Sequence, residues 1–128
     1  MQYANDEEST ISSLKHHLSS LGFHQSYNNS LEDIEEVKLF GKDAVSVMNP
    51  SSERMNTLRT NLHSGLLKNL DFNYRNGSAN TLIYEYGTIF EGKTDKLEDI
   101  TQKSSLSCLV HGDVCLLYTS DAADDQLG

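Results

Sequence analysis

The sequence predicts an α+β domain in which at least two helices pack on an incomplete antiparallel sheet. Apolar residues recur at helical spacing over residues 11–21 and again over residues 62–74. Residues 81–90 instead alternate like a β-strand and are rich in β-branched and aromatic side chains. At 128 residues the chain is long enough for one modest domain with one hydrophobic core.

The first predicted helix has an apolar face made of residues three or four positions apart. They are Ile11, Leu14, Leu18 and Leu21. Asn5, Ser9 or Thr10 is suited to cap the N-terminus of this helix. Gly22 is suited to end it, and residues 23–31 follow as a short strand with a polar exit.

The segment before the second helix is less regular. Residues 32–43 are acidic and mixed, and residues 44–48 form a brief apolar run suited to a strand. Asn49 and Pro50 stop that strand, because proline lacks the N–H that a sheet ladder needs. A short helical turn over residues 51–58, capped by a serine, is expected next.

The second predicted helix carries a ladder of apolar residues four positions apart, broadened by one more leucine. They are Leu62, Leu66, Leu70 and Tyr74, with Leu67. Thr60 or Asn61 is suited to bond its first free amides, and residues 76–78 are a turn signal. Gly65 costs this helix about 0.5–1 kcal/mol relative to alanine, which indicates a close approach by a neighbouring strand.

The strand over residues 81–90 has two different faces. One carries Leu82, Tyr84, Tyr86, Thr88 and Phe90, and the other carries Ile83, Glu85, Gly87 and Ile89. A carboxylate on a partly apolar face needs a partner, and Arg59 is the predicted partner of Glu85. A charged loop over residues 91–103 and another strand over residues 106–111 complete the expected elements.

Composition limits the function classes. The formal net charge of −9 argues against a main nucleic-acid docking surface, which needs clustered basic residues. No stretch approaches the ~20 apolar residues that span a bilayer, and the acidic N-terminus lacks a signal core, so a cytoplasmic location without a membrane partner is expected. Cys108 and Cys115 suffice for neither a disulfide framework nor a zinc site, so no metal ligands are predicted.

Fifteen positions between residues 49 and 90 follow one ordered pattern, in register and without a gap. They are Asn49, Pro50, Ser52, Leu58, Arg59, Leu62, Gly65, Leu66, Leu67, Leu70, Asn73, Leu82, Glu85, Gly87 and Phe90. This pattern resembles the central region of the β subunit of bacterial phenylalanyl-tRNA synthetase. The chain departs from the family at Ser51, Asn61 and Ser64, where the family usually has Leu, Ser and Pro.

The resemblance implies a class II aminoacyl-tRNA synthetase-like domain that lacks active-site residues. Its implied role is architectural: it packs against the catalytic α subunit in a heterotetramer that charges phenylalanine tRNA. ATP and magnesium are implied for that holoenzyme, and no cofactor for this chain. The helix bearing Leu14, Leu18 and Leu21 is similar to an element used at subunit interfaces in the class.

The strand end supports this expectation of lost chemistry. In catalytic class II synthetases the equivalent strand ends in Phe-Arg-x-Glu, and the arginine binds the α-phosphate of ATP. Here Phe90 is followed by Glu91, a carboxylate of the wrong charge, and Lys93 is a poor substitute for a planar guanidinium. Cys108 and His111 lie three positions apart on a predicted strand and so face opposite sides.

Two alternatives remain open at this point. One is a catalytic class II ligase fragment in which Arg75 or Arg54 replaces the missing arginine beside Phe90. The other is a free-standing acidic interaction module. Residues 1–114 are the expected partial domain, whereas residues 115–128 resemble a translated sequencing-library adapter and are expected to be a non-native read-through tail.

Overall fold

The computed structural model describes residues 2–39, 44–47, 54–92 and 97–113. In chain order the elements are α1 (Gln2–Ser20), β1 (His24–Gln25), β2 (Leu31–Glu32), α2 (Ile34–Lys38), β3 (Thr57–Leu58), α3 (His63–Arg75), β4 (Thr81–Glu91), the 3₁₀ turn η1 (Leu97–Asp99) and β5 (Thr101–His111). The predicted α+β class is confirmed. Within the described ranges, no helix has the length and apolar character needed to cross a membrane.

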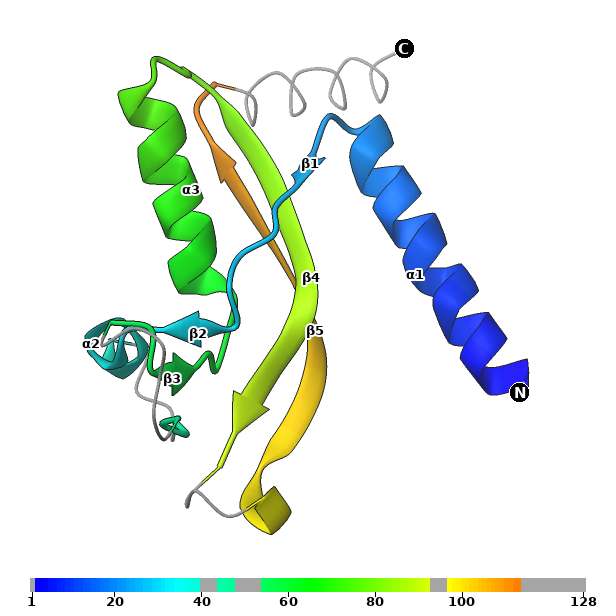
Figure 1. Cartoon of the computed structure of the whole chain (residues 1–128). Coiled ribbons are helices and arrows are strands. Elements are labelled where there is room, and N and C mark those ends of the chain that lie inside the picture. Colours follow the sequence, from blue (N-terminus) through cyan, green and yellow to red (C-terminus); the bar gives the residue numbers. More distant parts are fainter. Residues whose placement is uncertain (1, 40–43, 48–53, 93–96, 114–128) are drawn as a thin grey trace.

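The main sheet has three strands in the order β1-β4-β5 (Figure 1). β4 and β5 form a long antiparallel hairpin, in which Thr81 pairs with His111 and Glu91 with Thr101. β1 runs parallel to β4, so the predicted antiparallel arrangement holds for β4 and β5 but not for β1, and the sheet is mixed. Parallel neighbours need a long crossover connection, and β2, β3 and α3 provide it between β1 and β4.

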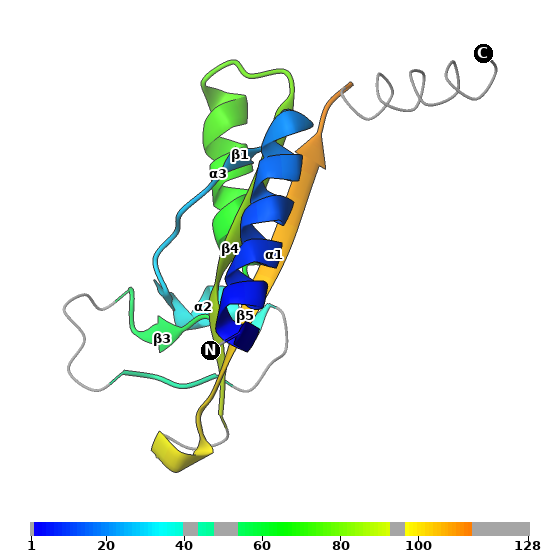
Figure 2. The same ribbon diagram turned by 90° about the vertical axis from the view of Figure 1, so that its right-hand side faces the viewer.

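Two helices cover opposite faces of this sheet (Figures 1 and 2). On one face the Lys15 ammonium of α1 lies over the Tyr86 ring, 5.3 Å from its centroid. On the other face α3 packs against β4, and a Cβ added at Gly87 would point toward Arg59 and toward Leu62, the residue before α3. The predicted alternation of β4 is therefore confirmed, since Tyr86 faces α1 and Gly87 faces the opposite side.

Helix α1 begins well before its predicted caps. Asn5, Ser9 and Thr10 all lie inside the helix, because the polar residues upstream continue it to Gln2. Its C-terminal end follows the prediction, since Gly22 has φ 97°, a left-handed value that suits glycine. Figure 1 shows this end beside β1, while the helix slants away from the sheet toward its N-terminus.

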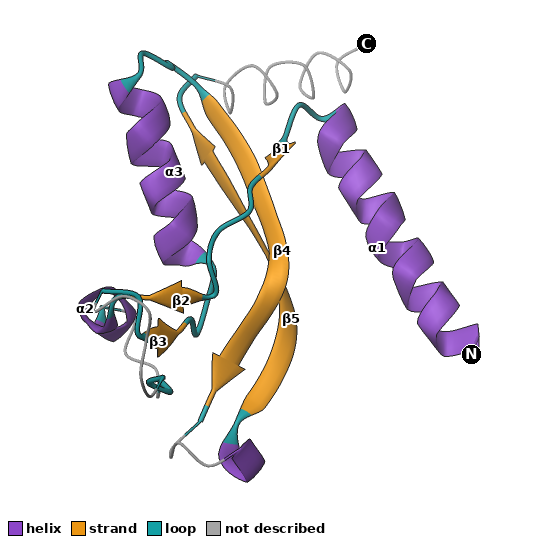
Figure 3. Cartoon of the chain, viewed as in Figure 1, coloured by secondary structure: helices purple, strands orange, loops and turns teal. Residues whose placement is uncertain are grey.

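The segment between β1 and α3 differs most from the prediction. Residues 34–38 form helix α2, which Asp33 caps by accepting the Glu35 backbone N–H at 3.0 Å. In place of the strand predicted at 44–48, Ser46 makes a single bridge to Thr57. Leu58 belongs to β3, not to a helical turn, and pairs with Leu31 of β2 in a second small sheet beside α2 (Figure 3). Backbone pairing with β2 thus overrides the local helical preference.

Helix α3 matches the second predicted helix closely. Asn61 Oδ1 accepts the His63 backbone N–H at 2.9 Å, as expected of a residue near the first turn. Leu62 and Leu66 are buried, but Tyr74 at the far end is exposed. The turn after the helix is also confirmed, since Gly77 has φ 91°.

Strand β5 begins at Thr101, five positions before the predicted start, so the charged loop is shorter than expected. The backbone ladder with β4 extends through these polar residues because β4 itself continues to Glu91. The buried core draws on α1, α2, α3, β4 and residues that flank β3. Its apolar members are Leu18, Val37, Val45, Leu62, Leu66, Ile83 and Tyr84.

Candidate functional site

Arg59 and Glu85 form a buried ion pair between β4 and the segment after β3. Arg59 Nη1 lies 3.1 Å from Glu85 Oε2, and both side chains are almost fully buried. The predicted partner of Glu85 is therefore confirmed. Arg59 also donates from Nε to the Thr88 carbonyl at 2.8 Å and from Nη1 to the Asn28 carbonyl at 3.2 Å.

Asn28 extends this pair into a network of four segments. Its backbone N–H donates to Glu85 Oε2 at 3.0 Å, and its Nδ2 donates to Glu85 Oε1 at 2.8 Å. The same Nδ2 donates to Asn69 Oδ1 of α3 at 2.9 Å. Both oxygens of the Glu85 carboxylate are thus bonded, which is what a buried charge requires.

Two glycines make room for the network. A Cβ at Gly65 would lie 2.8 Å from the Asn28 side chain, and a Cβ at Gly87 would collide with Arg59 Nη2. The close approach predicted at Gly65 is real, but the neighbour is the loop after β1 and not a strand. A helix glycine was the sequence signal for this contact, whereas nothing in the sequence indicated Asn28 or Asn69 as its partners.

Neither Arg59 nor Arg75 offers an unpaired guanidinium at the end of β4. Phe90 N–H donates to the Arg59 carbonyl at 2.9 Å, so Arg59 is the arginine beside Phe90, and its charge is neutralised by Glu85. Arg75 bonds to Asp71 at 3.1 Å on the exposed surface of α3. The ligase-fragment alternative is therefore not favoured.

A small cavity lies next to this network. It has a volume of about 200 Å³, and its walls include Asn28, Glu32 and Lys68. Burial and the nearby Glu36 carboxylate raise the pKa of Glu32 to about 7, against the smaller opposing effects of Arg59 and Lys68. The acidic composition around Glu32 gave no sign that this carboxylate would be buried.

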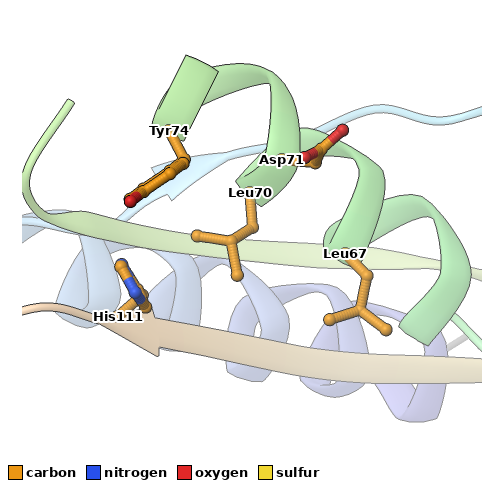
Figure 4. Close-up of a pocket in the computed structure, with 5 residues that line it drawn as sticks. All are labelled: Leu67, Leu70, Asp71, Tyr74 and His111. Atoms are coloured by element: carbon orange, nitrogen blue, oxygen red, sulfur yellow. The ribbon is translucent and has the colours of Figure 1, made fainter. Parts of the chain in front are cut away.

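An open apolar groove of about 300 Å³ runs between α3 and β5 (Figure 4). Leu70 and Tyr74 point from α3 toward His111 of β5, whereas Asp71 points away. The Tyr74 and His111 rings meet edge to face with centroids 6.2 Å apart. Among the described residues, no group of three or more His, Cys, Asp or Glu side chains is placed to hold a metal ion.

The remaining predicted site residues are spread over the molecule. Leu18 is buried in the chain itself, whereas Leu14 and Leu21 of the suggested subunit interface are exposed on α1. Phe90 is half-buried near the end of β4. Asn49 and Pro50 lie outside the described residues.

Comparison with known proteins decides the family. A model of the phenylalanyl-tRNA synthetase β chain CLM domain matches residues 1–124. The chain belongs to this family. Among the relatives named phenylalanine–tRNA ligase β subunit, that of Nitratidesulfovibrio vulgaris is 32% identical over 102 residues, covering 77% of this chain and 13% of the relative. That of Chlorobium chlorochromatii is 35% identical over 80 residues, or 62% of this chain and 10% of the relative.

A third relative of the same name, from Cereibacter sphaeroides, is 38% identical over 77 residues, covering 59% of this chain and 10% of the relative. The chain therefore spans only a small part of the length of these β subunits. Within this CLM-domain chain, widely separated positions of the family pattern meet in space: Arg59, Gly65, Glu85 and Gly87 all contact one buried network.

Proposed function

We propose that the chain is a piece of a phenylalanine–tRNA ligase β subunit that serves as a structural module for a catalytic α subunit. In this proposal the fold is class II synthetase-like and the complex is a cytoplasmic heterotetramer that charges phenylalanine tRNA. The chain supplies a packed scaffold and no reacting group. The membership of the family supports the identity of the whole protein, and the buried network supports the structural role.

The use of Arg59 is the observation that carries the proposal. A phosphate-binding arginine needs an unpaired guanidinium at the surface of a site. Arg59 instead bonds Thr88, Asn28 and Glu85 within the core. The exposed residue that follows Phe90 is Glu91, whose carboxylate repels phosphate, so these residues do not fit the phosphates of ATP.

An exchange assay tests the absence of chemistry. The isolated chain is expected to give no phenylalanine-dependent ATP–pyrophosphate exchange above a buffer control. When the rest of the β subunit and the α subunit are added, the exchange reaction is not expected to use Arg59 as a ligand of ATP. Exchange by the isolated chain would overturn the proposal, because carboxylates already pair with the guanidinium groups of Arg59 and Arg75.

The exposed part of the α1 apolar face is the proposed contact with the α subunit. Leu14 and Leu21 are exposed on the same side of α1 as the buried Leu18. In the full β subunit, Leu14→Asp is expected to weaken co-purification of the α subunit at least tenfold. Phe72→Asp on α3 is a matched control, because it places the same charge at another exposed apolar position. Equal effects of both changes would contradict the assignment.

The boundary of the domain is proposed with the function. Residues 1–114 form the partial domain in this proposal, and residues 115–128 are a non-native tail. Sequencing of the gene across codons 112–128 with flanking DNA is expected to show a different reading after Val114. An unchanged coding sequence through codon 128 would contradict this boundary.

A further inference from the structure

The cavity beside the buried network carries more negative charge than its surroundings compensate. Glu32 is only 9% exposed and lines the cavity, and its carboxylate makes no hydrogen bond to any part of the chain that the structure describes. Glu36 Oε2 is also buried without a partner in that part. Burial of a charged carboxylate that has no partner is costly unless a cation or a proton binds to it.

The two cations of the described residues that act on Glu32, Arg59 and Lys68, each pair with another carboxylate. Lys68 Nζ lies 2.7 Å from Glu36 Oε1, and Arg59 is paired with Glu85 at 3.1 Å. Each of these cations is matched by one acid, so Glu32 adds an uncompensated charge when it ionises. Four charged groups act on Glu32, and their charges sum to zero when Glu32 itself is left out. They are Glu36 of α2, Lys68 of α3, Glu85 of β4 and Arg59 of the segment after β3.

We propose that this cavity binds a primary ammonium group, supplied by a small aliphatic amine or by a lysine side chain of a partner protein. The Glu32 carboxylate accepts two of the ammonium N–H groups, and an amide oxygen from Asn28 is available for the third, since Asn28 uses Nδ2 for its bonds inside the network. Leu31 and Met55 on the cavity wall contact the attached methylene carbons.

A divalent metal ion fits this cavity less well. Calcium takes about 6–8 oxygen ligands and magnesium demands octahedral oxygens. Among the described residues the wall offers one carboxylate, two asparagine side chains and the paired Lys68 beside the apolar Leu31 and Met55. Fewer oxygens converge there than a divalent ion takes, whereas the apolar side chains suit a cation that carries its own hydrocarbon chain. A volume of about 200 Å³ accommodates an ammonium group with a short alkyl chain.

Binding is coupled to the protonation of Glu32. Burial and Glu36 raise the pKa of the Glu32 carboxyl to about 7, so at lower pH a proton occupies this carboxylate and competes with the ammonium group. Affinity is therefore expected to be highest at about pH 8 and to fall tenfold or more at about pH 5.5. This pH dependence belongs to the wild-type chain and needs no variant.

A titration of the full chain with n-propylammonium chloride, followed by ¹H–¹⁵N NMR, tests the proposal. Saturable shifts are expected at Gly65 and at the Asn28 and Asn29 side-chain amides at pH 8, with 1-butanol as the uncharged control probe. Glu32→Gln is expected to weaken binding at least tenfold. Glu35→Gln removes a charge from the exposed face of α2 and is expected to change binding less than twofold.

The same titration with Nα-acetyl-lysine amide and its norleucine analogue separates the two sources. Binding of the lysine derivative at least as tight as that of propylammonium assigns the site to a partner lysine, whereas binding of the free amine alone assigns it to a small amine. The proposal is overturned when neither ammonium probe saturates, when butanol binds equally well, or when the wild-type affinity is independent of pH.

Discussion

At the scale of single residues, Arg59 shows how a family position acquires its meaning from neighbours. Its guanidinium is bonded to two backbone carbonyls and one carboxylate in the core. A buried ion pair adds little stability over a well-packed apolar pair, but removal of one partner leaves a bare charge. The position is therefore sensitive to loss of one member of the pair.

Arg59→Met is expected to lower the free energy of unfolding by about 3–5 kcal/mol, because it leaves the Glu85 carboxylate buried without a cation. Urea-induced unfolding followed by circular dichroism measures the loss. Arg75→Met is the control, since its exposed pair with Asp71 is worth about 0–1 kcal/mol. A loss at Arg59 no larger than that at Arg75 would show that the pair is not buried as described.

Glu32 makes the stability of the chain depend on pH. Burial and Glu36 raise the pKa of the Glu32 carboxyl from its ordinary value of 4.5 to about 7, so the folded state binds the proton more tightly than the unfolded state. The stabilisation of the folded state by this tighter proton binding is complete below about pH 4.5 and is lost as the pH rises through about 7. Glu32→Gln is expected to match the wild type at pH 4.5 and to exceed it by about 2–3 kcal/mol at pH 8.

Thermal and urea unfolding at both pH values check this difference in free energy. Glu35→Gln on the exposed face of α2 serves as the control for simple charge removal and is expected to follow the wild type at both pH values. A constant difference between Glu32→Gln and the wild type across this range would contradict a raised pKa.

At the scale of elements, α3 illustrates a conflict between helix propensity and packing. Gly65 lies in the first turns of α3, where alanine would favour the helix by about 1 kcal/mol. The added Cβ would lie 2.8 Å from the Asn28 side chain, whose position the Glu85 carboxylate fixes. Packing decides the residue here, because Asn28 cannot move without breaking its hydrogen bonds.

Gly65→Ala is therefore expected to destabilise the chain by about 1–3 kcal/mol despite the gain in helix propensity. In an Asn28→Gly background the same change is expected to be neutral or stabilising, because every atom of the colliding side chain, its Cβ included, is gone. A double-mutant cycle from urea unfolding gives the coupling between the two positions. Additive effects would place the cost of Gly65→Ala elsewhere in the helix.

At the scale of the whole molecule, β5 is the edge of the main sheet in the part of the chain that is described. An antiparallel edge strand offers unpaired backbone groups to another chain. Beside it lies the apolar groove to which α3 contributes Leu67, Leu70 and Tyr74. For both reasons we expect the isolated chain to self-associate.

Cys108→Lys is expected to shift the isolated chain toward the monomer in sedimentation velocity under reducing conditions, because it places a charge in the middle of β5 opposite Tyr84. Cys108→Ser is the matched control. It removes the exposed thiol without adding charge, and is expected to leave self-association unchanged. Equal behaviour of both variants would exclude edge pairing through β5 as the cause.

Local patterns determined much of this protein. The 3.6-residue period of α3, the Asn-Gly turn after it and the alternation of β4 each follow from neighbouring residues, and the structure confirms them. The Glu85–Arg59 pair was also predictable, since a carboxylate on an apolar face requires a cation and Arg59 belongs to the same family pattern. The N-terminus of α1 was not predictable, because polar residues extended the helix past every expected cap.

Only the tertiary structure decided the rest. The parallel pairing of β1 with β4 and the bonds of Asn28 to Glu85 join residues more than fifty positions apart, so no local pattern contained them. The burial of Glu32 arises in the same way, from a cavity that β2 and α3 enclose together. The sequence alone determined which segments form helices and strands and which charged residues need partners. Long-range packing determined where those charged residues meet, because burial depends on neighbours that the chain brings together only when it folds.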